Sequence, residues 1–101
     1  MTYLMTITYD LNNSDTSVYP KIYKDLEELD FSKFIKGQKK IETKLPSNTF
    51  VAKFDVDEFE DKKDAREWLK EEIKEIFNTH GVSGKFFIAV SKGWAWSVGT
   101  V

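Results

Sequence analysis

The chain has 101 residues, a length at which one domain can bury a single hydrophobic core. Its 41% hydrophobic content, with 8 Phe, 4 Tyr and 3 Trp, indicates a folded globule and excludes a disordered chain. The absence of cysteine excludes disulfides and thiolate metal sites. The net charge is -2, and no apolar run approaches the roughly 20 residues of a membrane span, so we expect a cytoplasmic protein without membrane association.

The first predicted element is a strand within residues 3–12, around which the rest of the chain can be placed. β-Branched and aromatic residues dominate it. Its two faces alternate, and one of them carries Tyr3, Met5, Ile7 and Tyr9. Asp10 falls at the C-terminal end, before a turn-rich run. Its carboxylate can serve a functional site, or it can begin the turn by accepting backbone hydrogens.

A first helix is predicted after this turn. Its apolar residues recur at helical spacing and are Val18, Ile22, Leu26 and Leu29. Ser17 or Asp15 can cap its N-terminus. Residues 34–45 are predicted as a polar, basic second strand or a ribbon, and residues 49–54 as a third strand. The short turn at residues 45–48 joins these strands so tightly that it predicts a hairpin.

A second helix is predicted from Asp61 or Lys62 to Asn78. Its apolar stripe consists of Ala65, Leu69, Ile73 and Ile76. Acidic residues crowd its first half, and Gly81 stands where a left-handed C-terminal residue is expected. Residues 85–90 are predicted as a fourth strand.

The C-terminal tail carries two large indoles at alternating positions. Trp94, Trp96 and Val98 alternate with small residues, which predicts a short fifth strand at residues 94–98. Exposed edges and apolar patches favour association, so we expect the tail to be covered. Its cover is either its own sheet or a second copy of the chain. In the second case these three side chains form a homodimer interface.

The resulting order is βαββαβ with an appended strand. With right-handed crossovers, it predicts one α+β domain over residues 1–101, a ferredoxin-like sandwich. In this fold two helices cover one face of a four-stranded antiparallel sheet, here with an additional C-terminal strand. The other face stays open and, being apolar or neutral on the first strand, predicts a partner there.

Charge is distributed unevenly along the chain. Residues 33–53 hold six lysines against one glutamate, a net +5, whereas residues 55–80 hold ten acids against five basic residues, a net -5. A basic face can bind phosphates. Its candidate nucleic-acid contacts are Lys36, Lys39, Lys40 and Lys44. Two solvated faces of opposite sign are the plain alternative.

Familiar catalytic motifs are missing from the sequence. No phosphate loop, dinucleotide fingerprint, zinc-ligand spacing or nucleophile elbow occurs. The single histidine, His80, falls at a helix C-terminus, where a cation is favourable. Asp55 and Asp57 are close enough to share a cation, and are also typical of a solvated helix approach. The third strand lacks the Lys/Arg-Gly start of an RRM-type RNA-binding motif.

Three stretches resemble known families. Residues 7–12, ITYDLN, resemble the opening strand of the small CRISPR-associated adaptation protein, the second Cas protein. The run LPSNTFVAKF at residues 45–54, preceded by LDFSKFI at residues 29–35, is similar to GhoS-type antitoxins, a related ferredoxin-like group. The likeness covers most of the chain in layout.

This resemblance implies a homodimer with sheet faces together and a C-terminal strand able to join the neighbour's sheet. In the CRISPR group, strand-end aspartates of both subunits approach across the two-fold axis and can hold a divalent metal for phosphodiester hydrolysis. Asp10 is the matching position, and Mg²⁺ is the implied cofactor. The antitoxin group implies cleavage of a toxin's messenger RNA. The chain departs from a nuclease pattern because its only arginine, Arg66, lies on the acidic helix.

Two classes of function follow. The first is a small dimeric nucleic-acid-associated protein, a Mg²⁺-dependent endoribonuclease or antitoxin-like RNA-processing protein in which Asp10 is both catalytic residue and metal ligand. The second is a non-catalytic, antitoxin-like or inhibitor-like dimer that binds another protein through its tail or its acidic helix. Salt-dependent binding of RNA or DNA distinguishes the two.

Overall fold

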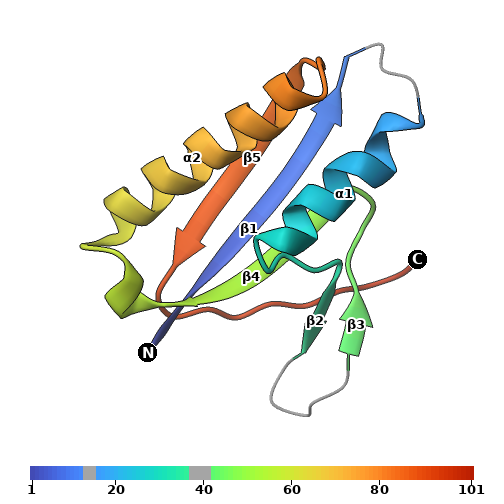
Figure 1. Cartoon of the computed structure of the whole chain (residues 1–101). Coiled ribbons are helices and arrows are strands. Elements are labelled where there is room, and N and C mark those ends of the chain that lie inside the picture. The colour runs from blue at the N-terminus through green and yellow to red at the C-terminus, as the bar shows by residue number, and fades with distance from the viewer. Residues whose placement is uncertain (13–15, 37–41) are drawn as a thin grey trace.

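The computed structural model describes residues 1–12, 16–36 and 42–101, and it has two layers, with both helices on one face of an antiparallel sheet (Figure 1). The elements in chain order are β1 (Thr2–Leu11), α1 (Val18–Glu28), β2 (Phe34–Lys36), β3 (Glu42–Lys44), β4 (Thr49–Asp55), the 3-10 helix η1 (Val56–Glu58), α2 (Lys62–Thr79) and β5 (Gly84–Ser91). The α+β class is confirmed, and the arrangement is compatible with a ferredoxin-like fold. In the described ranges, no helix combines the length and apolar character needed to cross a bilayer.

β1 is the central strand of the main sheet, as predicted. The strand order is β4-β1-β5, and both pairings are antiparallel. Thr6, midway along β1, lies opposite Val51 on one side and Ala89 on the other. β1 is therefore paired along both edges, whereas β5 ends the sheet and no described strand pairs with its outer edge.

The predicted four-stranded sheet with an additional C-terminal strand is wrong. Phe34–Lys36 and Glu42–Lys44 form two short strands, β2 and β3, which pair with each other, as in the ribbon alternative, and replace the hairpin expected with β4. An isolated bridge between Ser32 and Val51 links this segment to the main sheet. Pairing within the segment sets Ile35 opposite Thr43, and Ile35 is buried at 4% exposure. Burial of this one side chain against the main sheet favours the local hairpin.

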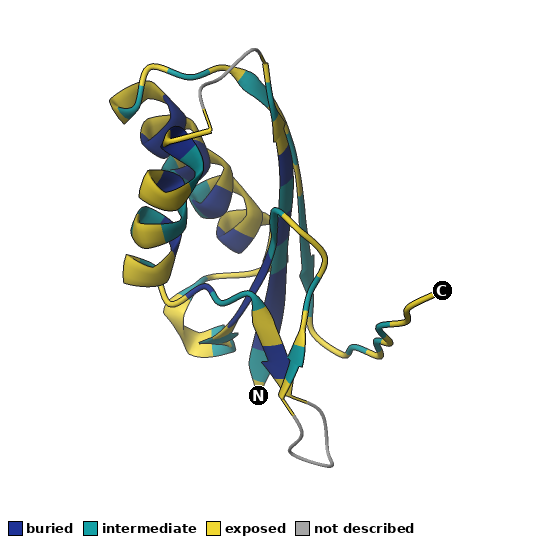
Figure 2. Cartoon of the chain, turned by 90° about the vertical axis from the view of Figure 1, so that its right-hand side faces the viewer, coloured by how far each residue is buried: buried dark blue, intermediate teal, exposed yellow. Residues whose placement is uncertain are grey.

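The main core lies between the sheet and the two helices, where the buried residues of both layers face each other (Figure 2). Met5, Ile7 and Phe50 are fully enclosed on the sheet side. The helices contribute Val18, Ile22, Leu26, Ala65, Leu69, Ile73, Ile76 and Phe77. Both predicted apolar stripes are thus confirmed, except that Leu29 lies at the C-cap of α1 and is only half-buried.

Both ends of α2 are capped by their own sequence. The Asp61 carboxylate accepts a backbone hydrogen bond in the first turn. At the other end Gly81 has a φ of 64°, and its N–H donates to the Asn78 carbonyl at 3.1 Å. The next N–H, from Val82, donates to the Phe77 carbonyl at 3.0 Å. This is a Schellman motif, so the predicted role of Gly81 is confirmed.

The tail, residues 92–101, contains no strand, and the predicted fifth strand at residues 94–98 is wrong. The tail leaves β5 and crosses the sheet on the side away from the helices (Figures 1 and 2). There Trp94 and Trp96 pack against a second, small cluster of Leu4, Ile35 and Val51. Because the tail crosses the strands instead of running beside one, its backbone does not enter a ladder.

Candidate functional site

The sheet side away from the helices, called the open face below, carries most of the predicted functional residues. By strand alternation it presents Leu4, Thr6, Thr8 and Asp10 of β1, Thr49, Val51 and Lys53 of β4, and Lys85, Phe87, Ala89 and Ser91 of β5. The tail covers the end near Leu4. The other end is uncovered, and Phe87 there is 62% exposed.

Asp10 is exposed near the C-terminal end of β1, at the rim of the open face. Its backbone is still paired within the sheet, and the turn that its carboxylate was expected to begin includes residues 13–15, which lie outside the described residues. Its cross-strand neighbour is Lys85, and the Cβ atoms of such pairs lie about 4.5–5.5 Å apart. Across the described residues, no three Asp, Glu, His or Cys side chains form a metal-binding group. Within the described residues, Asp10 is therefore a single carboxylate with a lysine as its cross-strand neighbour, which by itself does not fit Mg²⁺.

The predicted nucleic-acid contacts lie elsewhere. Lys36 and Lys44 are exposed on the β2-β3 hairpin, toward the N-terminal end of β1 (Figure 1). They occupy alternate positions on one side of the hairpin, and Glu42 lies opposite Lys36. Lys39 and Lys40 lie outside the described residues. The structure therefore groups two of the four lysines and separates them from Asp10.

Two lysines of the open face, Lys53 and Lys85, were not predicted as site residues. The Nζ atom of Lys53 lies 5.7 Å from the ring centroid of Trp94, a cation–π arrangement. Strand alternation could have revealed both lysines, because Lys53 follows Val51 by two residues and Lys85 precedes Phe87 by two. The open face therefore carries positive charge at both ends.

Trp94, Trp96 and Val98 are each half-buried. In the single chain the two indoles contact their own sheet, which is one of the two covers expected for the tail. The face with Phe87 is beyond their reach, since the packing partners of the indoles gather around Leu4.

Other candidate groups are structural. The Nε2 atom of His80 donates to Oδ2 of Asp25 at 2.6 Å, and this contact joins the end of α2 to α1. The predicted C-terminal position of His80 is thus confirmed. Asp55 accepts the Asp57 N–H at 3.0 Å and so caps η1, which explains this carboxylate pair without a cation.

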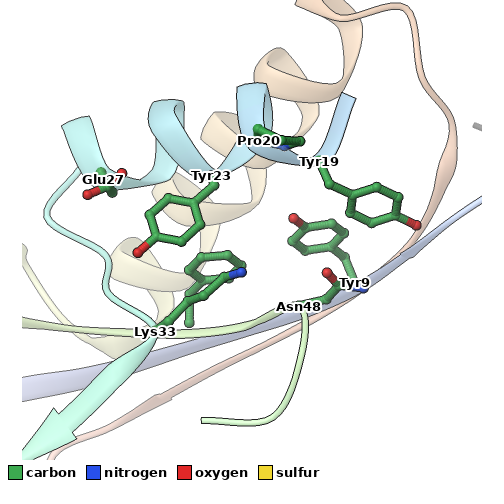
Figure 3. Close-up of a pocket in the computed structure, with 8 residues that line it drawn as sticks. Tyr9, Tyr19, Pro20, Tyr23, Glu27, Lys33 and Asn48 are labelled. Carbon is green, nitrogen blue, oxygen red and sulfur yellow. The ribbon is translucent and has the colours of Figure 1, made fainter. Parts of the chain in front are cut away.

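A concave site absent from the sequence predictions lies on the helix side of β1, below α1 (Figure 3). Its volume is about 400 Å³, and its walls include Tyr9, Tyr19, Tyr23, Phe50, Lys33 and Asn48. Burial, with a smaller contribution from neighbouring Tyr19, raises the pKa of Tyr9 to about 12. The Tyr9 phenol therefore stays protonated at neutral pH and can donate a hydrogen bond.

Comparison with known proteins gave no match. No protein-family model, no curated protein and no solved structure matches the chain.

Proposed function

We propose that two copies of this chain form a homodimer through their open faces, and that the dimer binds nucleic acid. The observation that carries the proposal is the uncovered half of the open face, where Phe87 is 62% exposed. Exposed apolar surface of this kind favours association. A two-fold contact places the same patch on both sides, so Asp10 of one copy can approach Lys85 of the other. The uncovered half of the open face thus carries both the acidic Asp10 and the basic Lys85, so two copies of it can be complementary in charge.

A second contact is available at the outer edge of β5. This edge strand, Gly84–Ser91, leaves a row of backbone donors and acceptors that no described strand uses. The tail of a second copy can pair there by strand addition. Trp94, Trp96 and Val98 then contribute to the dimer interface.

Nucleic-acid binding is supported by the distribution of charge. Seven of the ten acids of residues 55–80 fall in η1 and α2, and the other three, Asp55, Glu60 and Asp61, lie directly before these helices, whereas Lys36 and Lys44 lie on the hairpin. A dimer doubles the hairpin lysines and gives a basic surface that phosphates can bind. Lys39 and Lys40 add to this charge by sequence.

The finer proposal is Mg²⁺-dependent cleavage of RNA, with Asp10 as the catalytic residue and metal ligand. Two copies of Asp10 across the two-fold axis would provide the second carboxylate that one chain lacks. Mg²⁺ held there would polarise a phosphate and lower the pKa of bound water. The resemblance of residues 7–12 to the CRISPR adaptation protein, and of residues 45–54 to GhoS-type antitoxins, supports this proposal.

One observation favours the second candidate function, a non-catalytic dimer that binds a protein. Lys85 lies opposite Asp10 in the sheet, so a metal at this carboxylate would have a cation as its cross-strand neighbour. The tail or the acidic α2 would then contact the partner.

Fluorescence anisotropy with labelled single-stranded RNA and DNA tests the nucleic-acid proposal. Replacing Lys36 and Lys44 with Gln should weaken binding and lower the slope of log affinity against log salt by about 1 for each lost phosphate contact. The matched control is Lys21→Gln with Lys24→Gln, two exposed lysines of α1. No binding even at low salt would eliminate the nucleic-acid proposal.

Cleavage is tested separately with Asp10→Asn. The variant should lose Mg²⁺-dependent cleavage of RNA while keeping its affinity. Cleavage that persists unchanged in the variant would remove Asp10 from the mechanism.

A further inference from the structure

We propose that the hollow lined by Tyr9, Tyr19, Tyr23, Phe50, Lys33 and Asn48, the tyrosine pocket, binds a nucleobase with its attached phosphate. The ligand is either a free mononucleotide or one unpaired nucleotide of a strand. The volume of about 400 Å³ falls within the range of small-molecule sites. The pocket lies on the helix side of β1, opposite the open face, so it does not depend on the dimer proposed above.

The aromatic walls suit a flat ring. The ring of Tyr9 is nearly parallel to those of Phe50 and Tyr19, with interplanar angles of 7° and 16° and centroid distances of 6.0 and 6.2 Å. Tyr23 stands at 89° to Phe50, with its centroid 5.4 Å away, and forms an end wall. Bases stack on aromatic side chains with little dependence on base identity. Because Phe50 is fully buried and Tyr9 is only 4% exposed, these two rings form the floor of the pocket, and the half-buried Tyr19 and Tyr23 are the rings that can present a face to a base.

The described lining residues include one cation, Lys33, and one carboxylate, Glu27, and Lys33 is the group that can bind an anionic part of the ligand. Its Nζ atom lies 4.7 Å from the ring centroid of Tyr23 and 5.6 Å from that of Phe50. Within the described ranges, Lys33 forms no ion pair with a carboxylate. An ammonium that is half-buried among rings and lacks an anionic partner attracts an anion and repels a second cation. A phosphate beside Lys33 would complete the pair.

Polar groups in the pocket match the edge of a base. The hydroxyl of Tyr9 points into the hollow between α1 and the sheet (Figure 3). Because its phenol stays protonated at neutral pH, it can donate to a ring nitrogen or carbonyl. The Asn48 amide can both donate and accept, and the Glu27 carboxylate, also in the lining, can accept from an exocyclic amino group. Stacking, one cation and a few edge contacts together describe a nucleotide.

Isothermal titration calorimetry on the full chain tests this proposal with three sets of probes: nucleoside 5′-monophosphates, the matching nucleosides and short single-stranded oligonucleotides. Lys33→Gln should weaken monophosphate binding about tenfold or more, because a charge-assisted contact is lost, and should leave nucleoside binding unchanged. Asn48→Gly should weaken both several-fold. It should keep the fold, since Asn48 has a φ of 61° that glycine adopts freely.

The controls separate this site from general charge effects and from misfolding. Lys21→Gln, on α1 outside the pocket, should change nothing, and Lys33→Arg should restore monophosphate binding. Oligonucleotide binding that needs Lys33, without binding of free monophosphates, would assign the pocket to an unpaired nucleotide of a strand. The proposal would be overturned by no binding of any probe, or by equal effects of Lys33→Gln and Lys21→Gln. Choline is a further probe for a site that prefers a cation, and tighter binding of choline than of any nucleotide would also overturn the proposal.

Discussion

The phenol of Tyr9 is enclosed at 4% exposure, and it makes ring contacts with Tyr19, Phe50 and Phe77. Burial first, and Tyr19 second, raise its pKa from 10.0 to about 12. The folded chain therefore keeps a proton that the unfolded chain releases between these two values. The free energy of unfolding should be unaffected by Tyr9 below pH 10 and should fall as the pH rises to about 12.

Tyr9→Phe removes this titration. Between pH 10 and about 12, the free energy of unfolding measured in urea should therefore fall less for the variant than for the natural chain. Lysines also titrate at high pH, which makes the difference between the two chains the informative quantity. Identical pH dependence in both would contradict the assignment to Tyr9.

Gly81 illustrates how one backbone conformation ends a helix. At a φ of 64°, an added Cβ would meet no atom within 4 Å, so the cost of a side chain is backbone strain alone. Gly81→Ala should lower the free energy of unfolding by about 1 kcal/mol. Gly99→Ala is the matched control, because its Cβ also meets nothing and its backbone needs no left-handed conformation. Denaturant unfolding that ranked the two variants equally would refute the role of the turn.

At the scale of elements, the contact of His80 with Asp25 is the polar link between α2 and α1. The atoms are 2.6 Å apart, and the side chains are only 18% and 30% exposed. A double-mutant cycle with His80→Gln and Asp25→Asn should give a coupling of about 1 kcal/mol. The exposed pair Lys74 and Glu71 on α2, at 3.7 Å, should give only a few tenths of a kcal/mol. Equal coupling energies for the two pairs would show that the interhelical contact stabilises the fold no more than an exposed ion pair does.

Elements with strong local patterns were predictable, and elements whose partners are distant were not. The stripe of α2, from Ala65 to Ile76, and the stop at Gly81 both follow from local rules of periodicity and capping. Alternation cannot tell which strand a segment pairs with, so the sequence predicts one strand or a ribbon at residues 34–45, whereas the structure pairs β2 with β3. In the tail, alternation predicts a strand at residues 94–98, but there it reflects a half-buried segment that crosses the sheet.

The candidate site was predictable to the same extent. The position of Asp10 at a strand end could be read from the sequence, but its neighbour Lys85 depends on the register between β1 and β5. The tyrosine pocket could not be predicted from the sequence, because Tyr9, Tyr23 and Phe50 come from three elements that meet only in the folded chain. Individually, these aromatics have the pattern of ordinary core residues.

At the scale of the whole molecule, the two sides differ in what they bury. The helical side holds the main core, whereas the open face has only the small cluster under the tail and ends in uncovered surface around Phe87. A sheet with one side incompletely covered is the reason to expect a second copy. The proposed dimer contact and the tyrosine pocket lie on opposite sides of β1, so a variant can remove one without the other.

Light scattering on the purified chain over a range of concentrations tests the dimer most directly. The dimer proposal predicts twice the 11.8 kDa mass of one chain. Phe87→Glu should return the mass to that of a single chain, because it puts a charge into the contact. Phe34→Glu, at a hairpin residue that is 40% exposed and lies with Leu4 at the covered end of the open face, away from Phe87, should leave the dimer intact. A single-chain mass for the unaltered protein at the highest concentration would contradict the proposal.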